Sequence, residues 1–212
     1  MSDLATLGDR KVQQRTLETR AALIDTATEA FSTLGFEGIS VRQLEETAGV
    51  QRGLVAYHFG DKDGLWRAVV ADIFTDFAAR FGDRLPTLAD VSPVAAAGAL
   101  IKQFVRFSAA HPELNRLMMQ ECMQASWRVD HLVGEHVKPM LDALRAQLPE
   151  VYALLYGDGD PHRYYAMVGA GAFVFSAEHE CIGLFGANPR DAAFVERHAE
   201  MVVRMLLPAN EY

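Results

Sequence analysis

Apolar residues recur every three or four positions along this sequence, and Gly or Pro residues divide it into segments of helix length. The segment from about Gln14 to Leu34 shows the pattern most clearly, and Gly35 follows it in the position of a C-terminal cap. The alternation of apolar and polar residues that marks a half-buried strand does not occur. We therefore predict an all-α protein of about nine helices. The apolar face expected for the first helix consists of Leu17, Ala21, Ile24, Ala27, Phe31 and Leu34.

Two short helices are expected after the first one. Ser40 stands at the start of one of them, and Gln43 lies three residues on, which is the spacing of a capping box. Gly49 and Val50 interrupt this helix, and a third helix follows from about Arg52 to Phe59. Two short helices joined by a tight glycine turn are typical of a helix-turn-helix motif, although the pattern also occurs in purely structural helical corners.

Longer helices are expected in the rest of the chain. The fourth helix, capped by Asp61 or Asp63, should run towards Pro86. The longest apolar stretch, Ala166–Ser176, has about 11 residues, well short of the roughly 20 needed to cross a bilayer, so we expect no membrane span. The remaining helices are expected at about Pro93–Ala110, Glu113–Gln124, Arg128–Leu148, His162–Phe185 and Pro189–Leu207.

Charge and cysteine content restrict the class of protein further. There are 20 Lys and Arg against 28 Asp and Glu, a formal net charge of −8. This charge argues against sequence-blind binding of nucleic acid but leaves room for a small local binding face. The two cysteines, Cys122 and Cys181, are too few for a disulfide scaffold or a four-thiolate zinc site. Because the first twenty residues also lack the apolar run of a secretory leader, we predict a cytoplasmic protein.

Residues 40–59, SVRQLEETAGVQRGLVAYHF, and the following GDKDGLWRAV resemble the helix-turn-helix and the start of the fourth helix in the tetracycline-repressor (TetR/AcrR) family of transcriptional regulators. The resemblance covers about residues 15–70 and is weaker beyond them. It implies a DNA-binding domain at residues 14–62, followed by a helical ligand-binding and dimerisation domain at 63–212. Before the first helix we predict a basic, flexible arm at 1–13, because residues 10–20 contain Arg10, Lys11, Arg15 and Arg20 against Glu18 alone. The resemblance also implies a ligand-responsive regulator, which we predict to be a repressor that binds a palindromic operator in double-stranded DNA as a homodimer and is released by a small, largely apolar molecule.

The residues expected to contact DNA lie near the starts of the second and third helices. Val55 and Phe59 are four residues apart and should pack inward, which leaves the opposite face of the third helix towards the major groove. Arg52 can contact guanine and Gln51 can read adenine. By family analogy, further residues contact or position phosphates. The full set is Ser40, Arg42, Gln51, Arg52, Gly53, Leu54, Ala56, Tyr57, His58 and Lys62, with Arg10, Lys11 and Arg15 at the N-terminus.

Two residues depart from the family pattern. Gln51 stands where Ser or Thr usually caps the third helix, and Ala56 stands where an aromatic or polar residue is common. An unusual operator preference is therefore expected. Two roles stay open for Tyr57, whose ring can contact a phosphate or close the core of the domain. The basic arm can likewise contact DNA or remain solvated.

The resemblance also implies an effector pocket and a dimer interface in the C-terminal helices. Soft apolar side chains and two histidines are candidates for the pocket, although Met and aromatic residues at helical spacing also build ordinary cores. The candidate ligand-binding residues are Phe104, Phe107, Met118, Cys122, Trp127, His131, Tyr164, Met167, Phe175 and His179. Small residues and an apolar stripe on the last two helices can form a four-helix bundle with a second copy, or pack within one chain. The candidate interface residues are Gly171, Ala172, Phe175, Met201, Val202 and Met205.

Motifs for other chemistry are missing or incomplete. Glu178 and Cys181 share a helical face, but His179 points away from it, and His131 with Glu135 makes at most half of a metal site. Neither a Gly-x-Ser-x-Gly elbow nor a His-Glu-x-x-His stretch occurs. We predict no enzyme activity, no cofactor and no metal. The alternative is a helical small-molecule-binding protein or enzyme with a vestigial DNA-binding head.

Overall fold

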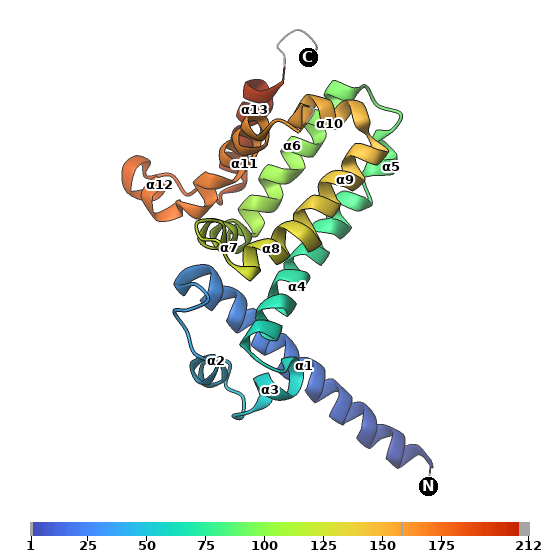
Figure 1. The fold of residues 1–212 in the computed structure, drawn as a ribbon, viewed down its shortest axis with the longest axis vertical. Helices are drawn as coiled ribbons and strands as arrows, with labels where there is room; N and C mark the ends of the chain where they lie inside the picture. The colour runs from blue at the N-terminus through green and yellow to red at the C-terminus, as the bar shows by residue number, and fades with distance from the viewer. Residues whose placement is uncertain (1, 158, 208–212) are drawn as a thin grey trace. The chain divides into compact units, whose positions relative to one another are not determined.

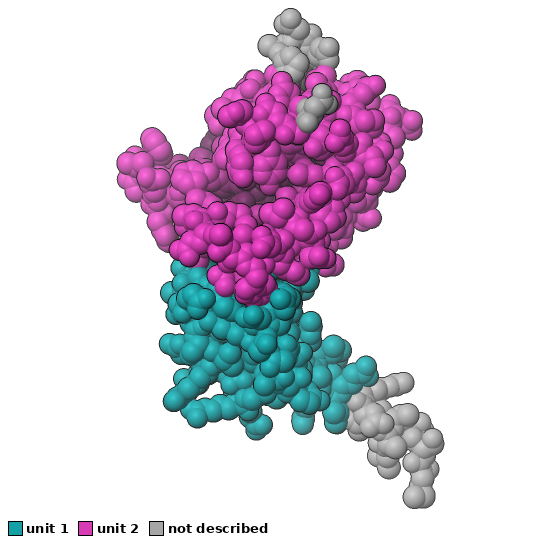
Figure 2. Space-filling view, in the orientation of Figure 1, with its two compact units in different colours: residues 1–73 teal, residues 74–212 magenta. Residues whose placement is uncertain are grey.

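The computed structural model describes residues 2–157 and 159–207, and of residues 2–11 the backbone alone. Every regular element in this part of the chain is a helix (Figure 1), which confirms the all-α prediction. The chain divides into two compact units, residues 1–73 and residues 74–212 (Figure 2). The division falls inside α4 (Lys62–Gly82) and not at its start, because the first turns of α4 bury Leu65, Trp66 and Val69 in the first unit.

The first unit is a small helical domain. It consists of α1 (Ser2–Leu34), α2 (Val41–Thr47), α3 (Leu54–Phe59) and the beginning of α4. Large apolar side chains from all four helices meet in its core, and burying each of them contributes about 1.5–3 kcal/mol to stability. The most completely buried of these side chains are Leu23, Phe31, Leu44, Val55, Leu65 and Trp66.

Helix α1 begins earlier than predicted. Its backbone is helical from Ser2, whereas the sequence predicts a flexible arm at residues 1–13 and a helix from about Gln14. The stretch contains no proline and a single glycine, Gly8, which weakens a helix by only about 1 kcal/mol. The backbone of the predicted arm therefore continues α1, and its contact with DNA stays a prediction.

The buried face of α1 also differs from the predicted one. Residues 12–18 are all exposed, and Leu17 and Leu34 keep 56% and 60% of their surface. The buried side chains of the described part of α1 lie between Leu23 and Ser32, so Leu17 falls outside the packed stretch. Of the predicted face, Ile24, Ala27 and Phe31 are buried, and Leu23 and Ala30 join them.

The second unit is built around α6 (Pro93–Ala110). Helices α10 (Pro149–Tyr156), α11 (Pro161–Ser176) and α13 (Ala192–Leu206) pack against α6 (Figure 1). Their apolar side chains form one continuous core. The other elements are α5 (Leu85–Leu88), α7 (Pro112–Cys122), α8 (Trp127–His131), the π-helical turn η1 (Leu132–Val137), α9 (Lys138–Gln147) and α12 (Glu178–Phe185).

One of the predicted long helices is divided, and another is continuous but contains a π-helical turn. The range Arg128–Leu148 contains α8, η1 and α9 in direct succession, and Pro149 then starts the separate helix α10 as its first residue. The range His162–Phe185 is interrupted at Ala177, whose ψ of 31° departs from helical values. Because no Gly or Pro marks this break, the sequence pattern does not reveal it.

Leu23→Ala and Leu17→Ala make the same change on two faces of α1. Leu23 is fully buried, so its truncation should leave a cavity and lower the free energy of unfolding by about 2–5 kcal/mol. Leu17 is exposed, so its truncation should change that free energy by less than about 0.5 kcal/mol. Urea denaturation followed by circular dichroism measures both values, and equal losses in the two variants would contradict the buried face assigned to α1.

Candidate nucleic-acid interface and effector cavity

Ser40 is the N-cap residue of α2, and the predicted capping box is present. The hydroxyl of Ser40 accepts a hydrogen bond from the backbone N–H of Gln43 (3.3 Å), and Oε1 of Gln43 accepts one from the backbone N–H of Ser40 (2.9 Å). Two N–H groups at the helix start are thereby satisfied. Arg42 follows in the first turn with its side chain exposed.

Helix α3 begins at Leu54, two residues later than predicted. Gly53 precedes it with a φ of 90°, a left-handed conformation that glycine adopts without strain. Val55 is buried, as predicted, whereas Phe59 is half-buried. The residues exposed in and before this helix are Gln51, Arg52, Gly53, Ala56 and Tyr57, and Leu54 and His58 are half-buried.

A carboxylate from α2, which the sequence analysis missed, holds the start of α3. Glu45 is buried, and its Oε1 accepts hydrogen bonds from the backbone N–H groups of Gly53 (3.0 Å) and Val55 (2.9 Å). It supplies the acceptor that a Ser or Thr in place of Gln51 would supply, and its negative charge suits a helix N-terminus. A signal was present in the sequence, because Glu45 stands four residues after the apolar Val41 and so shares its helix face.

Arg42 and Arg52 meet at one further carboxylate. Oε1 of Glu46 lies 2.9 Å from Nε of Arg42 and 3.3 Å from Nη2 of Arg52, and both arginine side chains are about two-thirds exposed. The hydrogen bond from Arg42 and, second, that from Arg52 lower the pKa of the Glu46 carboxyl, so this group stays ionised. The Arg42–Glu46–Arg52 cluster therefore carries two positive charges and one negative charge on the surface shared by α2 and α3.

The other predicted DNA contacts differ in how exposed they are and in what they contact. Tyr57 is 76% exposed, so its ring does not close the core of the domain. Lys62 extends over the ring of Phe36, with 4.3 Å between Nζ and the ring centroid. Near the N-terminus Arg15 is exposed, whereas the side chains of Arg10 and Lys11 lie outside the described residues.

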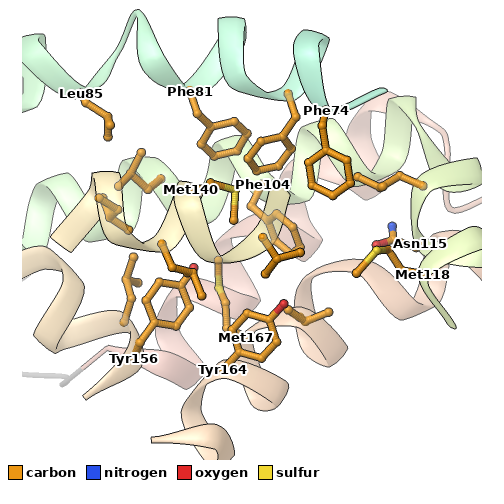
Figure 3. Close-up of a pocket in the computed structure, with 18 residues that line it drawn as sticks. Phe74, Phe81, Leu85, Phe104, Asn115, Met118, Met140, Tyr156, Tyr164 and Met167 are labelled. Atoms are coloured by element: carbon orange, nitrogen blue, oxygen red, sulfur yellow. The ribbon is translucent and has the colours of Figure 1, made fainter. Parts of the chain in front are cut away.

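Two adjoining cavities lie in the second unit. The inner one has a volume of about 140 Å³, and the outer, more open one has a volume of about 650 Å³. They share lining residues from α7, η1, α9, α10 and α11, so that one space continues into the other. Figure 3 shows Phe74 and Phe81 of α4 on one side of the inner cavity, with Tyr156 and Tyr164 on the opposite side.

Half of the predicted ligand-binding residues line these cavities, namely Phe104, Met118, Cys122, Tyr164 and Met167. The cavity walls do not include Phe107, Trp127, His131, Phe175 or His179. Phe175, for example, is buried in the core with its ring edge-on to His198. Helix α4 also contributes to the wall, which was not predicted. Its Phe74, Phe77 and Phe81 are spaced three and four residues apart and so lie on one face of the helix.

Charged side chains line only the outer cavity, where Lys138, Asp142 and Asp160 contribute to the wall. None of the described residues around the inner cavity is charged. Burial raises the pKa of both Tyr156 and Tyr164, so their phenol groups stay protonated at neutral pH. The inner cavity therefore offers neutral hydrogen-bond donors in an apolar wall.

Most of the predicted dimer residues are buried within the chain itself. Gly171, Ala172, Phe175 and Val202 belong to the core of the second unit, so we correct their assignment to internal packing. A Cβ atom at Gly171 would lie 2.8 Å from the ring of Phe104, which shows how closely α11 approaches α6 there. Exposed apolar side chains on α11 and α13 are Tyr165, Phe173, Met201 and Met205.

The structure also bears on metal and membrane binding. Across residues 2–157 and 159–207, no three His, Cys, Asp or Glu side chains are placed to hold a metal ion. Glu178, His179 and Cys181 of α12 accordingly do not form such a group. No helix in the described part of the chain has both the length and the apolar character needed to cross a membrane.

The chain matches two family models. One, described as bacterial regulatory proteins of the tetR family, matches residues 23–69, and the other, described as a tetracyclin repressor-like C-terminal domain, matches residues 93–206.

The HTH-type transcriptional regulator RutR of Escherichia coli is 28% identical over 203 residues, which cover 89% of this chain and 88% of RutR. The HTH-type transcriptional repressor AcnR of Corynebacterium jeikeium is 29% identical over 133 residues, 61% of this chain and 67% of AcnR. A crystal structure of a TetR-family transcriptional regulator from Pectobacterium atrosepticum shares 22% identity, covers 92% of this chain and 96% of that one, and has a TM-score of 0.45.

Replacing Glu45 tests whether its carboxylate holds the start of α3. Glu45→Ala removes the acceptor of two backbone N–H groups and should lower the free energy of unfolding by about 1–3 kcal/mol. Glu45→Gln keeps an acceptor oxygen without the charge, so it should lower the free energy of unfolding by less than Glu45→Ala does. Thr47→Ala, an exposed change at the end of the same helix, is the control. Chemical denaturation measures all three, and an unchanged stability of Glu45→Ala would refute the cap.

Proposed function

Because the chain belongs to the TetR family of bacterial regulatory proteins, we propose that it is a ligand-responsive transcriptional repressor. In this proposal a dimer binds a palindromic operator through its helix-turn-helix domains and leaves it when a small molecule occupies the second unit. The observation that carries the proposal is the Arg42–Glu46–Arg52 cluster beside the exposed start of α3. A helix-turn-helix that served only as a structural corner would not need this exposed pair of cations.

The cluster is suited to hold the two arginines ready for DNA. Glu46 engages one N–H group of each guanidinium, Nε of Arg42 and Nη2 of Arg52, and each guanidinium has five N–H donors in all. Enough donors remain for Arg52 to bind the O6 and N7 atoms of a guanine and for Arg42 to bind a phosphate. Glu46 therefore positions the cations without neutralising both of them.

Neighbouring residues complete the contact surface. Gln51 can read an adenine, and Ala56 can touch a thymine methyl from the exposed side of α3. Ser40, Tyr57, His58 and Lys62 are proposed to contact or position phosphates. The cationic contact is small within a protein of net charge −8, so we expect binding to depend on DNA sequence and to weaken as the salt concentration rises.

A second copy is the proposed partner of the exposed apolar side chains on α11 and α13. One α3 reads only a few base pairs, whereas two copies related by a two-fold axis read a palindrome. Tyr165, Phe173, Met201 and Met205 provide apolar surface that a second copy can bury. Met201 and Met205 are retained from the predicted interface, and Tyr165 and Phe173 take the place of its buried members.

The helix α4 gives the proposed response to ligand a physical route. Leu65, Trp66 and Val69 of α4 belong to the core of the DNA-binding unit, and Phe74 and Phe77 of the same helix line the inner cavity. A ligand that binds more tightly to one arrangement of α4 shifts the population towards that arrangement. We propose that the favoured arrangement is one in which the two α3 helices no longer match successive major grooves.

Substitution of Arg52 tests the DNA contact. On a fragment selected by the protein from random DNA, Arg52→Ala should weaken binding of the dimer at least about 30-fold, because each of the two half-sites loses a bidentate base contact of about 1–3 kcal/mol. Lys62→Ala should weaken binding to all sequences alike and flatten the salt dependence by about two units, one for each subunit. Arg190→Ala, an exposed change in the second unit, is the control. Fluorescence anisotropy measures each affinity, and equal, weak, sequence-blind binding by wild type and Arg52→Ala would instead favour a protein with a vestigial head.

Substitution of Met205 tests the dimer. Met205 is 64% exposed, so Met205→Arg should leave the folded chain intact while placing a charge in the proposed interface. We expect a monomer at micromolar concentration and operator affinity at least about tenfold weaker than that of wild type. Val91→Arg, an exposed apolar residue between α5 and α6, is the matched control. Sedimentation equilibrium gives the mass, and a wild-type monomer under these conditions would rule out the proposed assembly.

A further inference from the structure

A buried side-chain amide without a partner lies in the wall between the two cavities. Asn115 of α7 is 9% exposed and lines both the inner and the outer cavity. Its Nδ2 atom has no hydrogen-bond partner within the described part of the chain. Buried amide donors are seldom left unpaired, because the lost hydrogen bond to water is not replaced. Because Nδ2 itself has almost no accessible surface, the amide turns towards the cavity when an acceptor atom of a bound ligand satisfies this donor.

The inner cavity has the size and walls of a site for one aromatic ring. Its volume of about 140 Å³ is close to the roughly 150 Å³ of an apolar cavity that takes up benzene. Phe74, Phe81 and Phe104 contribute rings to its wall (Figure 3). Phe77 also lines the cavity, and its ring is stacked on that of Phe81 with 4.1 Å between centroids. Aromatic walls favour an aromatic guest through edge-to-face and offset contacts.

The charge of the wall selects against an ionic guest. Lys138 lines the outer cavity and is absent from the inner wall, so a carboxylate in the inner cavity would lose its hydration without gaining a cation. The hydroxyl groups of Tyr156 and Tyr164 point towards the interior of the cavity in Figure 3 and remain protonated. They can donate hydrogen bonds to a neutral oxygen but cannot balance a charge.

We propose that the effector is an uncharged aryl carbonyl compound whose ring occupies the inner cavity and whose carbonyl oxygen accepts a hydrogen bond from Nδ2 of Asn115. Any larger substituent extends into the outer cavity of about 650 Å³, where polar side chains line the wall. This inference rests on the proposed function in assigning the ligand a regulatory role. The binding chemistry itself rests only on the cavity.

Three small probes of similar size separate the contributions that the ring, the hydrogen-bond acceptor and the charge of a ligand make to its affinity. Acetophenone carries a ring and a neutral acceptor, ethylbenzene carries the ring alone, and benzoate carries the ring with a negative charge. Isothermal titration of the full chain without DNA should show acetophenone binding about tenfold more tightly than ethylbenzene, the usual effect of one neutral hydrogen bond. Benzoate should bind at least about a hundredfold more weakly than acetophenone.

Variants of Asn115 test whether this residue causes the preference for acetophenone over ethylbenzene. Asn115→Leu keeps the size and removes the donor, so it should bind acetophenone and ethylbenzene equally well. Asn115→Ala also removes the donor and should lose the preference, which covers the case in which Asn115→Leu fails to fold. Gln124→Leu, an exposed change beyond the end of α7, should bind like wild type.

The possible outcomes are distinct. Equal affinity of wild type for acetophenone and ethylbenzene, tighter binding of benzoate, or no binding of acetophenone would each overturn the ligand class. An unchanged preference in both Asn115 variants would overturn the role of Asn115. If acetophenone binds as expected but leaves operator affinity unchanged at saturation, the ligand class stands and the proposed regulation by ligand is refuted.

Discussion

One buried carboxylate sets the geometry on which the proposed DNA contact depends. Helix α3, Leu54–Phe59, is too short to be stable by itself, and a left-handed glycine precedes it. Glu45 satisfies the first free N–H groups of this helix from a neighbouring helix and so ties its start to α2. Successive residues on a helix point about 100° apart. Glu45 therefore turns inward to α3, while Glu46 turns outward to the two arginines. Both acids thus hold the surface that is proposed to contact DNA.

The second constraint is the continuity of α4. Its early residues complete the core of the first unit, and its later phenylalanines form a wall of the inner cavity. Binding energy at the cavity can thus act on the same helix that supports the DNA-binding core, without a separate relay element. A ligand alters DNA binding in this account only to the extent that it prefers one arrangement of α4 over another.

The sequence predicts the all-α fold, the capping box of Ser40 and Gln43, and the buried position of Val55, because each follows from local spacing. It does not predict the break at Ala177 or the burial of Gly171, because these depend on how α11 packs against other helices. The spacing of apolar residues identifies the apolar face of a helix, but it does not show which part of that face another helix covers. Leu17, for example, lies on the predicted face of α1 and is exposed. For the same reason, composition suggested five of the cavity residues and missed the phenylalanines of α4, which also fit an ordinary core.

We propose that paired α3 helices read a two-fold symmetric DNA site. Hydroxyl-radical footprinting of the wild-type protein on DNA selected from a random pool is the direct test. We expect two protected half-sites with related, inverted sequences, about 10 base pairs apart or a multiple of that spacing, on one face of the duplex. A single protected half-site, or uniform protection without sequence preference, would contradict it.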